Sequence, residues 1–309
     1  MHKSITGIIP VMLTPFDERD RVDYDSLERL IEWYLAHGSD ALFAVCQSSE
    51  MQRLSLAERL ELARFVQRQV AGRVPVIASG HVAEAADEQG EELAAMADTG
   101  VAAVVLVTNR LDPQQQGGDT LRRRLDALLQ RLPAELPLGL YECPVPYRRL
   151  LTDEELRHCA QSGRFVVLKD VSCDLATVRR RVQLTEGTPL AIVNANAAIA
   201  YEAIQAGSQG FSGVFTNFHP DLYAWLYHHW REQPQLAHEL AVFLALAAMA
   251  EPLGYPVLAK LWQQRLGNFA TAASRVIDFD VRERFWALDA LLDKIETGTE
   301  DFRQRIVAP

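Results

Sequence analysis

Eight short runs of apolar residues recur along the chain, and each is followed by a longer segment with helical spacing. This alternation indicates parallel strands joined by covering helices, an α/β architecture. Near-continuous Val, Ile and Leu fit strands buried on both faces. Eight units predict a closed (β/α)8 TIM barrel; the alternative is an open doubly wound sheet, but no GxGxxG follows the first strand. The expected strands are residues 7–13, 41–46, 75–80, 102–108, 138–142, 165–169, 190–195 and 210–215.

Strand signals stop after Phe215, and the remainder of the chain reads as three or four helices. No linker rich in Gly or Ser separates the two parts. We therefore expect a barrel domain over residues 1–218. A C-terminal helical extension over residues 219–309 would pack on the barrel or on a neighbouring subunit.

Several helix starts are expected from capping residues. SLAE at 55–58 and TDEE at 152–155 fit the capping box, in which a hydroxyl and a carboxylate satisfy each other's backbone donors. Asp119 and Asp174 are predicted N-caps of later helices.

Composition excludes several partners. A net charge of -10 argues against nucleic acid, whose binding needs clustered Lys and Arg. The four cysteines form no CxxC pair and the N-terminus does not resemble a signal peptide, so a reduced, cytoplasmic protein is expected. The most apolar stretch, 240–250, is shorter than the ~20 residues of a membrane span.

Lys169 stands at the end of the expected sixth strand, in FVVLKD. Chemistry in such a barrel gathers at the carboxyl ends of the strands. Removal of water lowers the pKa of a lysine and frees the amine for attack on a carbonyl. Asp170 should point away from the barrel axis, because side chains alternate along a strand. The plainer interpretation is a lysine that ends a strand and reaches solvent.

Two further places supply polar groups to the same end of the barrel. Tyr141 is near the end of the fifth strand, next to the sixth, where a phenol can shuttle protons, although a core aromatic is the more ordinary interpretation of this residue taken alone. The loop 47–50 after the second strand offers hydroxyls and backbone N–H groups for a carboxylate, or forms only a serine-rich turn.

The first alternative to chemistry on the Lys169 amine is a metal-dependent aldolase. Its metal ligands would be His81, Cys46, Cys143 and Cys173 near the barrel mouth. These residues have no recognised ligand spacing, and isolated thiols at strand ends are usually core residues. We therefore expect neither a metal nor another cofactor.

Together these segments resemble the class I aldolases grouped with dihydrodipicolinate synthase and N-acetylneuraminate lyase. The resemblance runs from about Ile5 to the last helices. It is carried by GIIPVMLTPFD, CQSSE, LSLAER, YECP, VVLKD and AGSQGFSGVFTN, and above all by the tyrosine before proline paired with LKD.

The resemblance implies a barrel with a C-terminal helical region, usually in a homotetramer, that forms a lysine imine with pyruvate or another 2-oxo acid. Lys169 would form the imine and Tyr141 would shuttle protons. Ser48 and Ser49, with Gln47, would bind the carboxylate of the 2-oxo acid. An aldehyde is the second partner, and the dimeric or tetrameric state stays open.

Three departures bear on the activity. The family loop Gly-Thr-Thr-Gly-Glu reads Cys-Gln-Ser-Ser-Glu at 46–50. The segment after strand four lacks the tyrosine of the relay between subunits, and Pro146 replaces an arginine that grips the aldehyde's carboxylate, with Arg148 and Arg149 nearby. Synthesis of 4-hydroxy-tetrahydrodipicolinate is therefore kept only as an alternative to carbon-carbon cleavage or formation.

Two further hypotheses stay open. One is a dehydratase of 2-keto-3-deoxy sugar acids that uses the same imine. The second is a non-enzymatic sensor that binds a 2-oxo acid. The aldehyde would be chosen by the loop residues Asn109, Arg110, Gln114, Glu142, Asn194, Asn196 and Ser212. Arg110 and the asparagines suggest a polar or acidic substrate.

Overall fold

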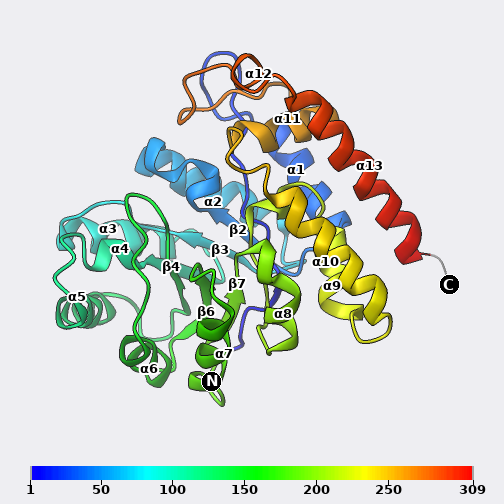
Figure 1. Cartoon of the computed structure of the whole chain (residues 1–309). Coiled ribbons are helices and arrows are strands. Elements are labelled where there is room, and N and C mark those ends of the chain that lie inside the picture. The colour runs from blue at the N-terminus through cyan, green and yellow to red at the C-terminus, as the bar shows by residue number, and fades with distance from the viewer. Residues whose placement is uncertain (1, 308–309) are drawn as a thin grey trace.

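The computed structural model describes residues 2–307 as a barrel of parallel strands with helices outside it (Figure 1). The sheet order β1-β8-β7-β6-β5-β4-β3-β2 is that of a (β/α)8 barrel, and the predicted fold class is confirmed. The strands are β1 (Gly7–Ile8), β2 (Leu42–Val45), β3 (Val76–Ser79), β4 (Ala103–Val107), β5 (Leu138–Tyr141), β6 (Phe165–Asp170), β7 (Ala191–Asn194) and β8 (Gly210–Phe211).

Around Pro10 the β1 segment is joined to β2 by an isolated bridge and backbone hydrogen bonds, among them Phe43 N–H to the Pro10 carbonyl at 3.0 Å and Met12 N–H to the Phe43 carbonyl at 3.1 Å. Pro10 has no N–H to donate, so the strand predicted at 7–13 is interrupted there. Pairing resumes at Val11, which bridges to Phe43 in parallel. The strand predicted at 210–215 is also shorter than expected, because a 3-10 turn, η4 (Val214–Asn217), follows β8.

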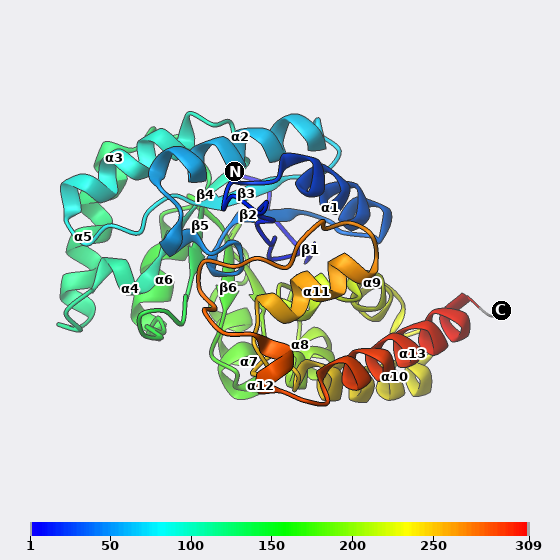
Figure 2. The same ribbon diagram turned by 90° about the horizontal axis from the view of Figure 1, so that it is seen from above.

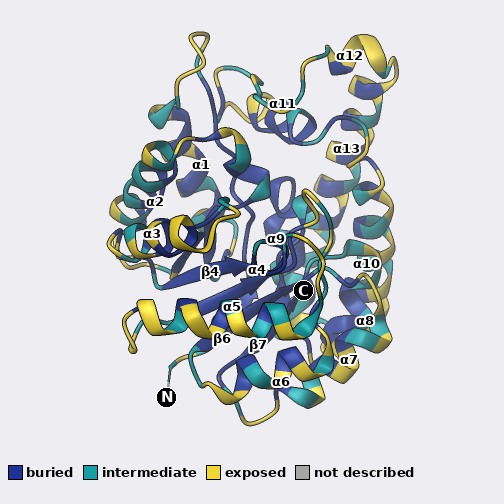
Figure 3. Ribbon diagram, turned by 90° about the vertical axis from the view of Figure 1, so that its left-hand side faces the viewer, coloured by how far each residue is buried: buried dark blue, intermediate teal, exposed yellow. Residues whose placement is uncertain are grey.

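The helices cover the outer face of the barrel, and Figure 3 shows the buried strands behind helices whose outer faces are exposed. Capping boxes at 55–58 and 152–155 are confirmed, as is the Asp174 N-cap. The prediction for Asp119 is wrong: the helix begins at Gly118, and Gly117 takes the cap position, two residues earlier than predicted. The barrel helices are α1 (Tyr24–Ala36), α2 (Leu56–Val70), α3 (Ala86–Ala97), α4 (Thr108–Leu111), α5 (Gly118–Arg131), α6 (Asp153–Gln161), α7 (Leu175–Leu184), α8 (Ala200–Gln205) and α9 (Pro220–His229).

Helix α9 packs against β1 and β8 and occupies the eighth helix position of the barrel. Beyond it lie α10 (Pro234–Ala248), α11 (Val257–Arg265), α12 (Val281–Arg284) and α13 (Leu288–Val307). Helices α10 and α13 lie side by side in Figures 1 and 2. The division into two domains at residue 218 stays a prediction.

The C-terminal region also reaches the mouth of the barrel. The segment between α11 and α12, coloured orange in Figure 2, contacts the loop after β2. Ser274 and Arg275 both donate hydrogen bonds to the Glu50 carboxylate, at 3.0 and 2.6 Å. None of the helices described within residues 2–307 is both long and apolar enough to cross a membrane.

Candidate active site

Lys169 lies on β6, directly opposite Tyr141 of β5 in the sheet register. Its Nζ atom is 4.6 Å from the centroid of the Tyr141 ring and 5.9 Å from that of Phe43. Only 7% of the residue is exposed. The lysine at the strand end is therefore inside the barrel mouth and packed on aromatic rings.

Burial lowers the pKa of Lys169 below its ordinary value. The nearby thiols of Cys46 and Cys143 and the carboxylate of Glu251 oppose this shift. Asp170, the next residue, turns to the outer face as predicted and pairs with Arg181. The amine therefore keeps no adjacent carboxylate from its own strand, which favours the free base needed for imine chemistry.

Tyr141 presents its phenol to the same cavity as Lys169. Its ring meets Phe43 edge to face at 5.6 Å. Burial raises the pKa of Tyr141 well above the ordinary value, so the phenol is protonated at neutral pH. A protonated phenol beside the amine can give a proton and receive another, as a relay requires.

The predicted carboxylate ligands in the loop after β2 do not all face the cavity. Gln47 and Ser48 line the cavity. Ser49 instead points at its own backbone: its Oγ accepts a hydrogen bond from the Cys46 N–H and donates one to the Cys46 carbonyl, both at 2.7 Å. The Ser49 hydroxyl thus holds the turn η1 (Gln47–Ser49) in shape.

Two other predicted ligands lie close by with their polar groups engaged. The Ser212 hydroxyl donates to the Ile9 carbonyl at 2.8 Å. The Asn194 side chain donates to the Asn196 carbonyl at 2.8 Å and accepts from the Asn196 N–H at 3.0 Å. Both side chains therefore brace the ends of β7 and β8.

These groups meet around a cavity of about 180 Å³. It brings together Lys169, Tyr141, Gln47 and Ser48, and two more residues come from the region beyond the barrel. Glu251 and Tyr255 were missed by sequence reasoning, since no local pattern tells which side chains of a C-terminal turn face a barrel. The lining is Gln47, Ser48, Tyr141, Pro144, Lys169, Val171, Cys173, Ala195, Asn196, Gly213, Val214, Glu251 and Tyr255.

Arg181 of α7 organises the outer face behind the two central residues. Its guanidinium donates to Glu142 at 2.6 and 2.9 Å and to Asp170 at 2.5 Å, and all three side chains are buried. Burial alone would lower the pKa of Arg181, but the two carboxylates outweigh it and raise that pKa. The expectation that Glu142 selects the aldehyde is wrong, because Glu142, directly after β5, points outward and pairs with Arg181.

The remaining candidates for aldehyde recognition lie away from the cavity, except Asn196. Asn109 donates to three backbone carbonyls of the loop after β5, and Gln114 pairs with Gln116. Arg110 pairs with Glu84 at 3.1 Å. Of the arginines near Pro146, Arg148 donates to the carbonyls of Val171 and Ser172, and Arg149 pairs with Asp112 and Glu155.

His81 has a structural role. Its Nε2 accepts a hydrogen bond from the Val107 N–H at 2.7 Å, which occupies the lone pair a metal would need. Desolvation lowers the pKa of His81 to about 3, so the ring is neutral. Within residues 2–307, no three His, Cys, Asp or Glu side chains gather as a metal site would require.

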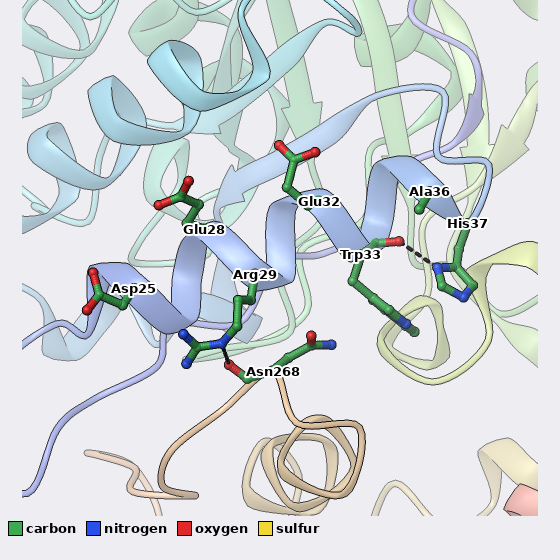
Figure 4. A pocket seen from close by; sticks show the side chains of 8 residues that line it. All are labelled: Asp25, Glu28, Arg29, Glu32, Trp33, Ala36, His37 and Asn268. Carbon is green, nitrogen blue, oxygen red and sulfur yellow. Dashed lines mark hydrogen bonds between the residues drawn. The ribbon is translucent and has the colours of Figure 1, made fainter.

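A larger hollow of about 640 Å³ lies elsewhere, along the outer face of α1. Figure 4 shows its side chains on that helix and on the segment that carries Asn268, with Arg29 donating to the Asn268 carbonyl at 2.9 Å. None of its lining residues belongs to the cavity around Lys169. We place the chemistry at the smaller cavity, because only there does a desolvated amine stand beside a phenol.

Known proteins resemble this chain along most of its length. Residues 4–272 match the model of the dihydrodipicolinate synthetase family. The 4-hydroxy-tetrahydrodipicolinate synthase of Cellvibrio japonicus is 31% identical over 217 residues, which cover 70% of this chain and 72% of that protein. The enzyme of the same name from Pseudomonas aeruginosa is 28% identical, with 70% and 72% covered.

Solved structures show the same fold. A dihydrodipicolinate synthase of Bacillus anthracis superposes with a TM-score of 0.85 at 21% identity, over 95% of this chain and 99% of that one. The enzyme of Acinetobacter baumannii, solved with pyruvate, gives 0.84 at 23% identity, over 95% and 99%. The chain therefore belongs to the dihydrodipicolinate synthetase family, and it is an enzyme of the pyruvate-dependent Schiff-base aldolase class.

Proposed function

We propose that Lys169 forms an imine with the C2 carbonyl of pyruvate or of a larger 2-oxo acid, and that the enzyme makes or breaks the bond between C3 and C4. The observation that carries this proposal is the desolvated Lys169 amine facing Tyr141 across β5 and β6. Ser48 is the proposed ligand of the 2-oxo acid's carboxylate, with Gln47 beside it. The other predicted ligands would act indirectly, by holding the backbone around the cavity in place: Ser49, Asn194 and Ser212.

The proposed cleavage needs no group beyond these side chains. The amine attacks C2, water leaves, and the protonated imine draws electrons from C3. As the C3–C4 bond breaks, its electron pair moves toward the imine nitrogen and the C4 hydroxyl gives up its proton, so an aldehyde leaves. The resulting enamine takes a proton at C3, and water then releases pyruvate and the free amine. Tyr141 would relay these protons.

Borohydride reduction with pyruvate present tests the imine. We expect a fixed adduct on the peptide that carries Lys169 and none on the peptide of Lys260, which is also a buried lysine. A Lys169→Ala variant should lose the adduct and the turnover. Full turnover in that variant would contradict the proposal.

A matched pair of tyrosine variants tests the relay. Tyr141→Phe should slow imine formation by about 10²-fold or more. Tyr223→Phe is the control, because Tyr223 is buried too and its hydroxyl has no hydrogen-bond partner within residues 2–307. Equal rates in the two variants would remove Tyr141 from the mechanism.

The activity named for the curated relatives, 4-hydroxy-tetrahydrodipicolinate synthesis, is the second candidate. The sequence similarity to those enzymes favours it. The positions of Arg148 and Arg149 favour cleavage or formation of another bond instead, because neither side chain lines the cavity. A direct assay of the synthase reaction beside a screen for pyruvate release separates the two.

We propose further that the enzyme is a cytoplasmic homo-oligomer. A reducing compartment would keep the thiols of Cys46 and Cys143 beside Lys169 free. Three exposed apolar side chains lie at helical spacing on α10 and its C-cap and would present an apolar surface to a second copy: Val242 (47% exposed), Leu246 (68%) and Met249 (71%). Light scattering of the wild type and of Leu246→Glu tests whether this stripe is an interface.

A further inference from the structure

Glu251 stands on the wall of the cavity that contains Lys169, although it lies beyond the barrel, just after α10. It is the only carboxylate among the lining residues of this cavity, and Lys169 is the only cation. The residue as a whole is exposed, so the carboxylate is at the rim and open to an incoming molecule.

Within residues 2–307, no side chain pairs with the Glu251 carboxylate. Desolvation raises its pKa, and the charge of Lys169 opposes that rise. The effect is mutual, since Glu251 opposes the lowering of the Lys169 pKa. A polar group that is partly desolvated and unpaired is one that a bound molecule can satisfy.

A second hollow of about 180 Å³ continues from this cavity beneath the C-terminal end of α10. The two share Ala195, Asn196, Val214 and Glu251. Asn196 uses its side-chain oxygen to accept from the Ala198 N–H, which leaves its NH₂ group as a donor toward the hollow. The second hollow therefore offers the Glu251 carboxylate as an acceptor and the Asn196 NH₂ group as a donor. Its lining includes no cation.

The cations near this cavity other than Lys169 lie outside its lining: Arg148 donates to the backbone carbonyl of Val171, a lining residue, at 3.1 Å. Arg53 and Arg110 line a separate hollow of about 480 Å³, which meets the cavity at Gln47 and Tyr255. Arg110 is already paired with Glu84. A substrate that extends from Lys169 toward Asn196 thus meets no further cation in the lining of either hollow and comes close to Glu251.

We propose that Glu251 is a specificity-determining residue that accepts a hydrogen bond from a hydroxyl of the aldehyde fragment and repels a fragment carrying a second carboxylate. The enzyme then favours 2-oxo acids whose tail is neutral and hydroxylated. This inference rests on the proposed function and narrows its substrate class. An unpaired negative charge against the wrong partner is a common source of discrimination.

Two 4-hydroxy-2-oxo acids of matched size provide the test: the adduct of pyruvate with glycolaldehyde, whose tail ends in a hydroxyl, and that with glyoxylate, whose tail ends in a carboxylate. The rate of borohydride trapping on Lys169 is measured for each, together with pyruvate release. We expect the wild type to favour the neutral tail by about tenfold or more. Glu251→Gln should shrink this preference, chiefly by accepting the carboxylate tail.

Glu296→Gln is the control, since Glu296 is an exposed carboxylate on α13, far along the chain from the cavity. It should leave the preference unchanged. A wild type that traps both acids equally, or neither, overturns the inference, as does a preference that Glu251→Gln leaves intact. Trapping of pyruvate alone distinguishes the outcomes: if pyruvate labels Lys169, the proposed function stands while the role of Glu251 falls.

Discussion

The Nζ atom of Lys260 lies 2.5 Å from Oε1 of Glu50, and neither side chain is exposed to solvent. Glu50 belongs to the loop after β2 and sits in the left-handed region at φ 62°, whereas Lys260 belongs to α11. Lys260 also donates to the Ala273 carbonyl at 2.6 Å. The C-terminal extension therefore fixes the loop that presents Gln47 and Ser48 to the cavity.

Lys260→Met should destabilise the fold by about 3–5 kcal/mol, because it leaves the Glu50 carboxylate buried without its cation. The loss is measured by urea unfolding. Adding Glu50→Gln to this variant removes the unpaired charge and should recover part of the stability. If the double variant is instead as unstable as the sum of the two single ones, the two side chains are not coupled.

Arg181→Met should lower the free energy of unfolding by a similar amount, about 3–5 kcal/mol, because it leaves the buried carboxylates of Glu142 and Asp170 without their cation. Imine formation should slow as well, because Glu142 directly follows Tyr141 at the end of β5 and Asp170 directly follows Lys169 on β6. Arg180→Met on the same helix is the matched control. Arg180 pairs with Asp153 at the surface, with 49% of its side chain exposed, so its loss should cost less than about 1 kcal/mol.

The barrel and the proximity of Lys169 to Tyr141 were predictable from the sequence. Hydrophobic periodicity is a local property of the sequence, and consecutive strands of such a barrel lie side by side. Side chains alternate along a strand, which directed Lys169 inward and Asp170 outward. The same reasoning, applied to Glu142 after Tyr141, would have removed it from the aldehyde site. The error was to group Glu142 with the loop residues although the expected strand 138–142 includes it.

The contributions of the C-terminal region were not predictable in this way. Glu251 and Tyr255 lie in a turn between two helices, and their direction depends on how that turn packs on the barrel mouth. The hydrogen-bond partners of the Ser49 hydroxyl also could not be read from the sequence, because they depend on the conformation of the turn. A hydroxyl in a tight turn is drawn to neighbouring backbone groups, here those of Cys46.

Imine formation should become faster as the pH rises and level off above the pKa of Lys169, since only the free amine attacks. Burial lowers that pKa, so the midpoint should fall below 10.5, the ordinary value for lysine. Glu251→Gln should move the midpoint to still lower pH, because the carboxylate stabilises the ammonium form. Borohydride quenching at subsaturating pyruvate gives the profile, and a midpoint at or above 10.5 would be incompatible with a desolvated amine.

Gly139 of β5 precedes Tyr141 by two residues, so both positions face the barrel interior. A Cβ atom there would lie 2.9 Å from Cγ2 of Val105 and 3.0 Å from Cγ1 of Val167. Gly139→Ala should therefore overpack the barrel floor and cost about 1–3 kcal/mol in urea unfolding. Val167→Ala removes one of the two opposing methyl groups. The double variant should lose less stability than the sum of the losses in the two single variants. Strict additivity would show that the Cβ atom at position 139 does not clash with Val167.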